Sequence, residues 1–261
     1  MKERVKILGV SVDKIKLDRL FSKTQAYLNE EACHVIYFVG MKTVLYAKEN
    51  ESFTDFLEDC DYAIVAERTM EEKIYGEKSN NSKEKMLLAQ RYLERLLIRM
   101  NKNRLSLYLI GTEEEAIQTL SNNLAQYYSG IKCHGSTIYP DVEEEDVDSI
   151  INEVNAVVPD VMFIFMDGQR TMEFLRKNRL KMNVKLCLCI GEAEEAVLQE
   201  IGLEADVPKW VKYLGLERLY RKLFDNSNLS HTVLKKTFQK RIKQEDLEQE
   251  HETKKKEKNG V

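Results

Sequence analysis

The stretch Val161-Met162-Phe163-Ile164-Phe165-Met166 decides the fold class of this chain. Every residue in it is apolar, and no polar residue recurs at alternate positions. A strand with one solvated face alternates polar and apolar side chains, whereas a strand that is buried on both faces is apolar throughout. Such strands belong to parallel sheets that carry helices on each side. The stretch therefore predicts a central strand of a parallel sheet.

Other short apolar runs continue this pattern along the chain, with amphipathic helical patterns between them. The predicted strands are Val5–Val10, Val35–Val39, Tyr62–Ala66, Leu105–Ile110 and Val184–Ile190, and helical patterns include Lys14–Leu28, Glu113–Tyr128 and Glu144–Val154. This alternation predicts an α/β, Rossmann-like fold with a mostly parallel sheet and helices on both faces. Ligands of such folds bind at the carboxyl ends of the strands. The residues that follow each strand are therefore the candidates for a functional site.

Composition limits the classes to which this protein can belong. The chain has 261 residues, of which 43% are hydrophobic and only three are proline, so it can form one large domain or one domain with an appendage. It contains no apolar run of roughly 18 to 20 residues. Its start, Met1-Lys2-Glu3-Arg4, leads into a short strand rather than into a signal-peptide core. We expect a protein that stays in the cytoplasm and has no nucleic-acid partner.

The five cysteines favour neither a disulfide framework nor a metal site. Their number is odd and most lie in apolar, strand-like surroundings, which predicts reduced, buried thiols. The pairs Cys33-His34 and Cys133-His134 cannot offer both side chains to one ion, because neighbouring residues of a strand point to opposite faces. Cys187-Leu188-Cys189 has no companions at the usual zinc spacing. We expect no bound metal ion. We also expect His34 and His134 to lie near strand ends, where neighbouring groups hydrogen-bond them.

Two stretches near the ends of the chain carry a family resemblance. One is Ile7-Leu8-Gly9-Val10-Ser11-Val12-Asp13, and the other is Val207-Pro208-Lys209-Trp210 followed by Gly215-Leu216-Glu217-Arg218-Leu219-Tyr220-Arg221. In this order they resemble the WecG/TagA/CpsF family of bacterial glycosyltransferases, whose members begin with I-L-G-V-x-V-D and close with A-P-x-W and G-L-E-W-L-Y-R. The segment from Asn155 to Phe165 also resembles the family's N-x-x-x-P-D and the strand after it. The resemblance spans residues 5–224.

The resemblance implies a division of the chain and a catalytic residue. We expect a glycosyltransferase-like core over residues 1–206, a helical C-terminal appendage over 207–244, and a charged, disordered tail over 245–261. Relatives place their catalytic aspartate in a P-D-G stretch after the third strand, where this chain has Ala66-Glu67-Arg68. Glu67 keeps a carboxylate there and is the candidate general base. Arg221 matches an arginine that completes the site in relatives, so it is a candidate diphosphate contact; a salt bridge to Glu217 is the alternative.

Other polar positions of the family carry different residues in this chain. Phe38 and Gly40 replace the threonine and asparagine of T-x-N, and their side chains cannot hydrogen-bond a sugar or a phosphate. Thr171 and Met172 stand where relatives have glutamine and glutamate, and Gln169 and Glu173 could compensate only after a shift around the helix. The stretch Gly191-Glu192-Ala193-Glu194-Glu195 would repel a diphosphate and indicates a helix start instead.

The remaining candidate substrate contacts lie at other strand ends. Ile110-Gly111-Thr112-Glu113 predicts a strand, a glycine turn, an N-cap and a helix start, so Gly111 and Thr112 could present N–H groups to a phosphate. Plain helix capping is the alternative interpretation. Gly40 marks the site at the end of the second strand, and Arg68 and Arg170 are further cations for a departing diphosphate.

Two functions are consistent with these residues. The resemblance implies transfer of an N-acetylhexosamine-type sugar from a UDP-sugar to a polyprenyl-diphosphate-linked acceptor in cell-surface polysaccharide or teichoic acid synthesis. We expect no cofactor for this reaction. The alternative is a paralogue that kept the scaffold, lost catalysis, and acts as a partner or regulator of a polysaccharide-synthesis complex.

The segment Ser227–Lys243 contains no acidic residue and has an amphipathic pattern. On a helix its apolar residues fall on one face and most basic residues lie outside that face; the apolar residues are Leu229, Val233, Leu234, Phe238 and Ile242, and the basic ones Lys235, Lys236, Lys240, Arg241 and Lys243. This pattern predicts a helix on an anionic membrane surface, at the inner face of the plasma membrane. Docking of the stripe on the protein's own domain, or on a partner, is the alternative. The sequence leaves open whether the chain forms a homo-oligomer.

Overall fold

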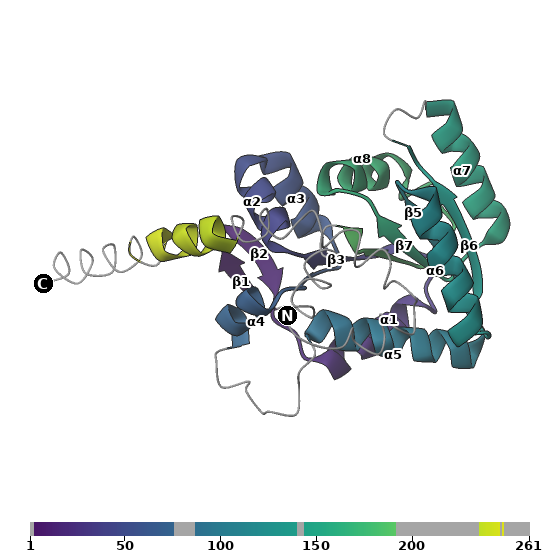
Figure 1. Ribbon diagram of the computed structural model, residues 1–261, viewed down its shortest axis with the longest axis horizontal. Helices are drawn as coiled ribbons and strands as arrows, with labels where there is room; N and C mark the ends of the chain where they lie inside the picture. Colours follow the sequence, from purple (N-terminus) through teal and green to yellow (C-terminus); the bar gives the residue numbers. More distant parts are fainter. Residues whose placement is uncertain (1–2, 76–86, 140–143, 192–234, 246, 248–261) are drawn as a thin grey trace, which may run out of the picture.

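A computed structural model describes residues 3–75, 87–139, 144–191, 235–245 and 247 (Figure 1). Its main sheet has six strands, all parallel, in the order β4-β3-β8-β7-β5-β6. The strands are β3 His34–Val39, β4 Tyr62–Val65, β5 Ser106–Gly111, β6 Lys132–Thr137, β7 Val161–Phe165 and β8 Leu186–Cys189. The predicted α/β fold with a parallel sheet is therefore confirmed.

Strand β7 lies inside the sheet, between β8 and β5. Its side chains alternate between two hydrophobic clusters, since Met162 and Ile164 belong to one and Val161 and Phe163 to the other. All four are buried. The continuous apolar run is thus explained by burial on both faces.

Helices cover both faces of the sheet (Figure 1). On one face lie α1 Leu17–Tyr27, α5 Leu88–Asn103 and α6 Glu114–Tyr127. On the other lie α2 Met41–Glu49, α3 Glu51–Asp59, α7 Glu144–Val157 and α8 Gly168–Asn178. Helix α4, Arg68–Tyr75, packs Met70 and Ile74 into this second layer.

The predicted first strand, Val5–Val10, is wrong. The chain reverses within it and forms an antiparallel hairpin of β1 Arg4–Ile7 and β2 Val10–Asp13, separate from the main sheet. The two turn residues have positive φ, 50° at Leu8 and 85° at Gly9. Such two-residue turns match the twist of paired strands, and glycine adopts this conformation without steric cost.

The hairpin protects the edge of the main sheet through Asp13. Strand β2 lies beside the edge strand β4, and the Asp13 Oδ2 atom accepts the backbone N–H of Ala63 at 2.7 Å. The Oδ1 atom of the same carboxylate lies 3.3 Å from Arg4 Nε. Asp13 is 2% exposed and Ala63 is 1% exposed, so this carboxylate satisfies a buried N–H group that water cannot reach.

We expect Asp13→Ala to lower the free energy of unfolding by about 2 kcal/mol, because it leaves the Ala63 N–H buried without its acceptor. Urea denaturation followed by circular dichroism measures the change. Asp18→Ala is the matched control, since Asp18 pairs with Arg95 on the surface and is 89% exposed. An equal effect of the two variants would contradict the edge-protecting role of Asp13.

Strand β6 was missed because its sequence, Lys132-Cys133-His134-Gly135-Ser136-Thr137, contains no apolar run. It pairs with β5 on one side only and is largely exposed or half-buried. An edge strand does not need the two apolar faces that made the inner strands recognisable. The predicted runs for β3, β4, β5, β7 and β8 agree with the observed strands within two residues.

The helix over residues 235–245 docks on the hairpin and on α2. Phe238 is fully buried in the cluster that contains the hairpin residues, and Ile242 packs against the same cluster. The Leu8 N–H donates to Glu245 Oε2 at 3.1 Å, and Arg241 pairs with Glu49 at 3.0 Å. Phe238 and Ile242 therefore agree with the alternative interpretation, in which the apolar stripe docks on the protein's own domain. The rest of the predicted stripe and the proposed boundary between residues 206 and 207 lie outside the described residues. The helix continues through Glu245, the first residue of the predicted tail.

Candidate functional site

Four helices begin directly after strands at the carboxyl edge of the main sheet. Helix α2 follows β3, α4 follows β4, α6 follows β5 and α8 follows β7. From β5 the chain passes outward to β6, whereas from β7 it passes to β8 on the other side. The strand order reverses between β5 and β7, and ligands of open α/β sheets bind outside such a reversal point.

Glu67, the predicted general base, lies after β4 and between the N-termini of two helices. Its side chain is 1% exposed, and its Oε1 accepts the backbone N–H of Met41, the first residue of α2, at 2.5 Å. Its own carbonyl oxygen accepts the N–H of Glu71 in α4. The carboxylate thus satisfies an N–H group that lacks an intrahelical acceptor, in a position favourable for negative charge. This capping role was not evident from the sequence.

Gly40 and Phe38, which stand at the family's T-x-N positions, lie in different surroundings. Gly40 is the N-cap residue of α2, and its N–H donates to Thr43 Oγ1 at 3.2 Å. Phe38 is 2% exposed and packs edge-on against Tyr92 of α5. Gly40 therefore belongs to the carboxyl edge, whereas Phe38 belongs to the core.

Gly111 and Thr112 lie at the reversal point. A Cβ atom on Gly111 would come within 2.8 Å of Ile117 Cδ1, so α6 packs tightly on the end of β5. The N-cap of α6 is Glu113, without a side-chain capping bond. The prediction that Thr112 is the N-cap is wrong, because Thr112 precedes the N-cap by one residue.

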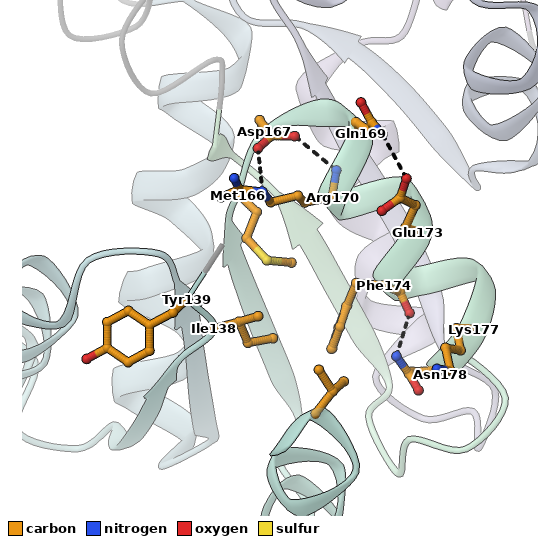
Figure 2. A pocket seen from close by; sticks show the side chains of 11 residues that line it. Ile138, Tyr139, Met166, Asp167, Gln169, Arg170, Glu173, Phe174, Lys177 and Asn178 are labelled. Carbon is orange, nitrogen blue, oxygen red and sulfur yellow. Dashed lines mark hydrogen bonds and ion pairs between the residues drawn. The ribbon is translucent and has the colours of Figure 1, made fainter. Parts of the chain in front are cut away.

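Arg170 is held at the N-terminus of α8 by Asp167. The Asp167 Oδ1 atom accepts the Arg170 N–H at 2.9 Å, and Oδ2 lies 3.2 Å from Arg170 Nε (Figure 2). The next two residues point into the protein, since Thr171 is 1% exposed and Met172 is 7% exposed. Thr171 Oγ1 donates to the Met166 carbonyl oxygen. The positions of the family's glutamine and glutamate are thus occupied by core side chains.

A pocket of about 580 Å³ lies beside α8, on the sheet face that also carries α7 (Figure 2). Ile138, Met166 and Phe174 form buried apolar parts of its lining, and Val147 of α7 adds a half-buried one. The polar lining residues are Tyr139, Asp167, Gln169, Arg170, Glu173, Lys177 and Asn178. An apolar lining with a few polar groups is typical of small-molecule sites.

The structure does not describe the side chains of the other two predicted cations, Arg68 and Arg221. Arg68 is the first residue of α4, so its backbone stands at the carboxyl end of β4, while its side chain lies outside the described structure. Arg221 and the whole stretch from Val207 to Arg221 also lie outside the described residues. Their roles remain proposals.

His34 is a satisfied histidine, as predicted. Its Nδ1 lies 2.9 Å from Asp61, its Nε2 lies 2.8 Å from Glu30, and its ring stacks on Tyr27. Cys33, Cys60, Cys187 and Cys189 are buried thiols, also as predicted. Within the described part of the chain, no three His, Cys, Asp or Glu side chains are grouped to hold a metal ion.

A family model described as "Glycosyl transferase WecG/TagA/CpsF family" matches residues 5–239. The chain belongs to this family. It is also 21% identical, over 229 residues and 85% of each chain, to an N-acetylglucosaminyldiphosphoundecaprenol N-acetyl-beta-D-mannosaminyltransferase of Staphylococcus aureus strain NCTC 8325 / PS 47. The protein of the same description from strain COL has the same identity and coverage. The resemblance at the two ends of the sequence is therefore confirmed, and the protein is classified with glycosyl transferases.

Tyr139 and Asp167 line the pocket but were not among the residues predicted from the sequence. Asp167-Gly168 after an apolar strand is an N-cap signal that could have identified Asp167. Tyr139 follows the overlooked strand β6. Its hydroxyl donates to Glu114 Oε2 at 3.0 Å, and this hydrogen bond raises the pKa of the Tyr139 phenol.

Proposed function

We propose that this protein transfers an N-acetylhexosamine-type sugar from a UDP-sugar to a polyprenyl-diphosphate-linked acceptor in cell-surface polysaccharide synthesis. The family match over residues 5–239 is the observation that carries this proposal. The name of the staphylococcal relatives specifies a diphosphoundecaprenol-linked acceptor and an N-acetylmannosaminyl group. A pocket beside the strand-order reversal gives further support, because ligands of α/β sheets bind there.

In this proposal Glu67 removes the proton from the attacking acceptor hydroxyl. General-base catalysis requires the carboxylate within about 3 Å of that hydroxyl. Because the Glu67 side chain is 1% exposed, this proposal requires the acceptor to reach the carboxylate along the N-termini of α2 and α4, at the carboxyl edge. Gly40, at the start of α2, leaves this approach without a side chain.

The departing diphosphate needs cationic or N–H partners. Arg221 is the proposed principal contact, with Arg68 and Arg170 as additional cations. Gly111 and Thr112 are proposed to present backbone N–H groups at the end of β5. The proposed sugar transfer needs no cofactor, because it requires only a base and stabilisation of the developing charge.

Isothermal titration calorimetry with UDP and a panel of UDP-sugars tests the donor site directly. We expect UDP to bind with a Kd below millimolar and at least one UDP-N-acetylhexosamine to compete for the same site. An absence of binding up to millimolar concentration would exclude the transferase and favour a scaffold that has lost catalysis.

We further propose that the helix over residues 235–245 attracts the protein to an anionic membrane, where a polyprenyl-linked acceptor resides. Phe238 and Ile242 pack on the domain, so basic side chains carry this attraction in the described part of the helix. Lys236, Lys240 and Lys243 are exposed. None of the described helices is long and apolar enough to cross a bilayer.

The full-length protein is expected to sediment with anionic liposomes at low salt, and deletion from Ser227 onward is expected to abolish sedimentation. Replacing Lys236, Lys240 and Lys243 together by glutamine should weaken partitioning roughly 100-fold, since each basic residue contributes about 1 kcal/mol. Lys102, Lys132 and Lys181 replaced together provide a control with equal charge loss at other sites. Equal sedimentation of the intact and truncated proteins would refute a membrane role for this segment.

A further inference from the structure

Four of the five cysteines gather in one hydrophobic cluster, on the sheet face that carries α3 and α8. They are Cys33, Cys60, Cys187 and Cys189. Two of them are in contact, since the Sγ atoms of Cys33 and Cys187 lie 3.5 Å apart although 154 positions separate the two residues in the sequence. A disulfide bond is about 2.05 Å long, so an approach of about 1.5 Å joins the two sulfur atoms. The fold has therefore brought two distant thiols almost to bonding distance.

The backbone around this contact permits such an approach. Val35 of β3 is the register partner of Cys187 in β8, and Cys33 lies two residues before Val35, in the same hydrophobic cluster. Strand β3 begins at His34, so Cys33 precedes the strand. The segment that carries Cys33 can move toward β8 without loss of the hydrogen bonds between the two strands.

The two thiols differ in access and in acidity. Cys33 is 9% exposed and follows the exposed residues Glu31 and Ala32, whereas Cys187 is fully buried. The hydrogen bond between the two sulfurs lowers the pKa of Cys33 against the effect of burial, and the nearby Arg179 guanidinium lowers it further. The same hydrogen bond, together with burial, raises the pKa of Cys187. Because the thiolate is the reactive form, a small oxidant reacts first at Cys33.

We propose that Cys33 and Cys187 form a reversible oxidation site, at which a hydroperoxide such as hydrogen peroxide converts the two thiols into a disulfide. The Cys33 thiolate attacks one peroxide oxygen, the O–O bond breaks, and Cys33 becomes a sulfenic acid while hydroxide leaves. The Cys187 sulfur then attacks the Cys33 sulfur and displaces the second oxygen as water. In sum, two thiols lose two electrons and two protons, and one hydrogen peroxide becomes two water molecules.

The disulfide joins the beginning of β3 to β8, near the middle of the sheet. It constrains the unfolded chain between two residues that are 154 positions apart, and a crosslink over so long a segment favours the folded state. The oxidised protein therefore resists unfolding better than the reduced one. This inference is independent of the proposed sugar transfer.

Thiol titration and peptide mapping of the full chain test the assignment. Reduced protein, freed of reductant, is treated with hydrogen peroxide, denatured and titrated for free thiols. We expect the number of free thiols to fall from five to three and dithiothreitol to restore five. Trypsin should then release residues 24–42 linked to residues 186–209 from the oxidised protein. Retention of all five thiols, or a link that excludes Cys33, overturns the proposal.

Alanine variants identify the second sulfur, because residues 186–209 contain both Cys187 and Cys189. Cys33→Ala and Cys187→Ala should abolish the linked peptide, whereas Cys189→Ala should retain it. Cys133→Ala is a further control, since Cys133 is less buried but lies in β6, four strand spacings or about 19 Å from β3. Circular dichroism verifies that each variant is folded. A link that persists in Cys187→Ala overturns the assignment.

Two further measurements test the order of reaction and the effect on stability. In Cys187→Ala, dimedone should trap the sulfenic acid on Cys33; equal or faster labelling of Cys187 in Cys33→Ala would reverse the proposed order. The melting temperature of the oxidised protein should exceed that of the reduced protein by about 5 °C or more, with no difference between the two conditions in Cys33→Ala. An unchanged or lower melting temperature after the bond has formed contradicts its stabilising role.

Discussion

Glu67→Gln is expected to lower the turnover of sugar transfer by about 100-fold or more, the range for loss of a general base. Glutamine keeps the length and one oxygen acceptor of the side chain, so it can still accept the Met41 N–H that caps α2. The fold should therefore survive while proton removal is lost. Initial rates with the donor identified by calorimetry, together with thermal melts, measure the two effects separately.

Glu71→Gln is the matched control for this variant. Glu71 lies in the same helix, α4, and its Oε1 accepts the Leu88 N–H at 2.9 Å, so the chemical change and the type of hydrogen bond are alike. We expect its turnover to remain within a factor of about three of the unmodified protein. Unchanged turnover in Glu67→Gln would remove Glu67 from the mechanism.

Glu67→Asp separates the capping role from the catalytic one. Aspartate restores the residue of the family but is one methylene shorter, so it should lose the bond to Met41 and destabilise α2 by about 1 kcal/mol. If the longer side chain is displaced from the acceptor, turnover rises despite this loss of stability. A fall in both quantities would show that the position of the glutamate carboxylate suits this chain.

The inner strands could be predicted because a strand that is buried on both faces is apolar throughout. Val161–Phe165 is such a continuous apolar run, and so are the runs that form β3 and β8. The hairpin and β6 show no such pattern. The reversal at Leu8 and Gly9 depends on two positive φ angles inside an apolar run, and β6 is stabilised by pairing with β5 rather than by apolar residues of its own.

The position of a candidate residue at the carboxyl edge could be predicted where that residue ends or directly follows a strand. Glu67 and Gly111 were located this way, and both lie at the carboxyl edge. The pocket could not be anticipated, since it joins Tyr139, Val147 and α8 across two crossovers of the sheet. The capping bond from Glu67 to Met41 likewise joins residues 26 positions apart, a contact that no local pattern encodes.

Gly191→Ala is expected to lower the free energy of unfolding by about 3 kcal/mol or more. Gly191 follows β8, and an added Cβ would lie 2.0 Å from the Met166 carbonyl oxygen and 2.6 Å from its backbone nitrogen. Backbone atoms at the end of β7 cannot rotate aside as a flexible side chain can, so the two strand ends must separate. Overpacking of this kind costs typically 1 to 3 kcal/mol and sometimes more, which corresponds to a fall in melting temperature of about 10 °C.

Gly111→Ala distinguishes this clash from a general intolerance of alanine at strand ends. Its Cβ would meet the terminal Cδ1 atom of Ile117 at 2.8 Å, a side-chain atom that another rotamer can move, so the loss should be about 1 kcal/mol. Equal melting temperatures for the two variants would contradict the close approach of Gly191 to the Met166 backbone. Because Met166 also lines the pocket beside α8, the displacement in Gly191→Ala should change the shape of that pocket even below the melting temperature of the variant.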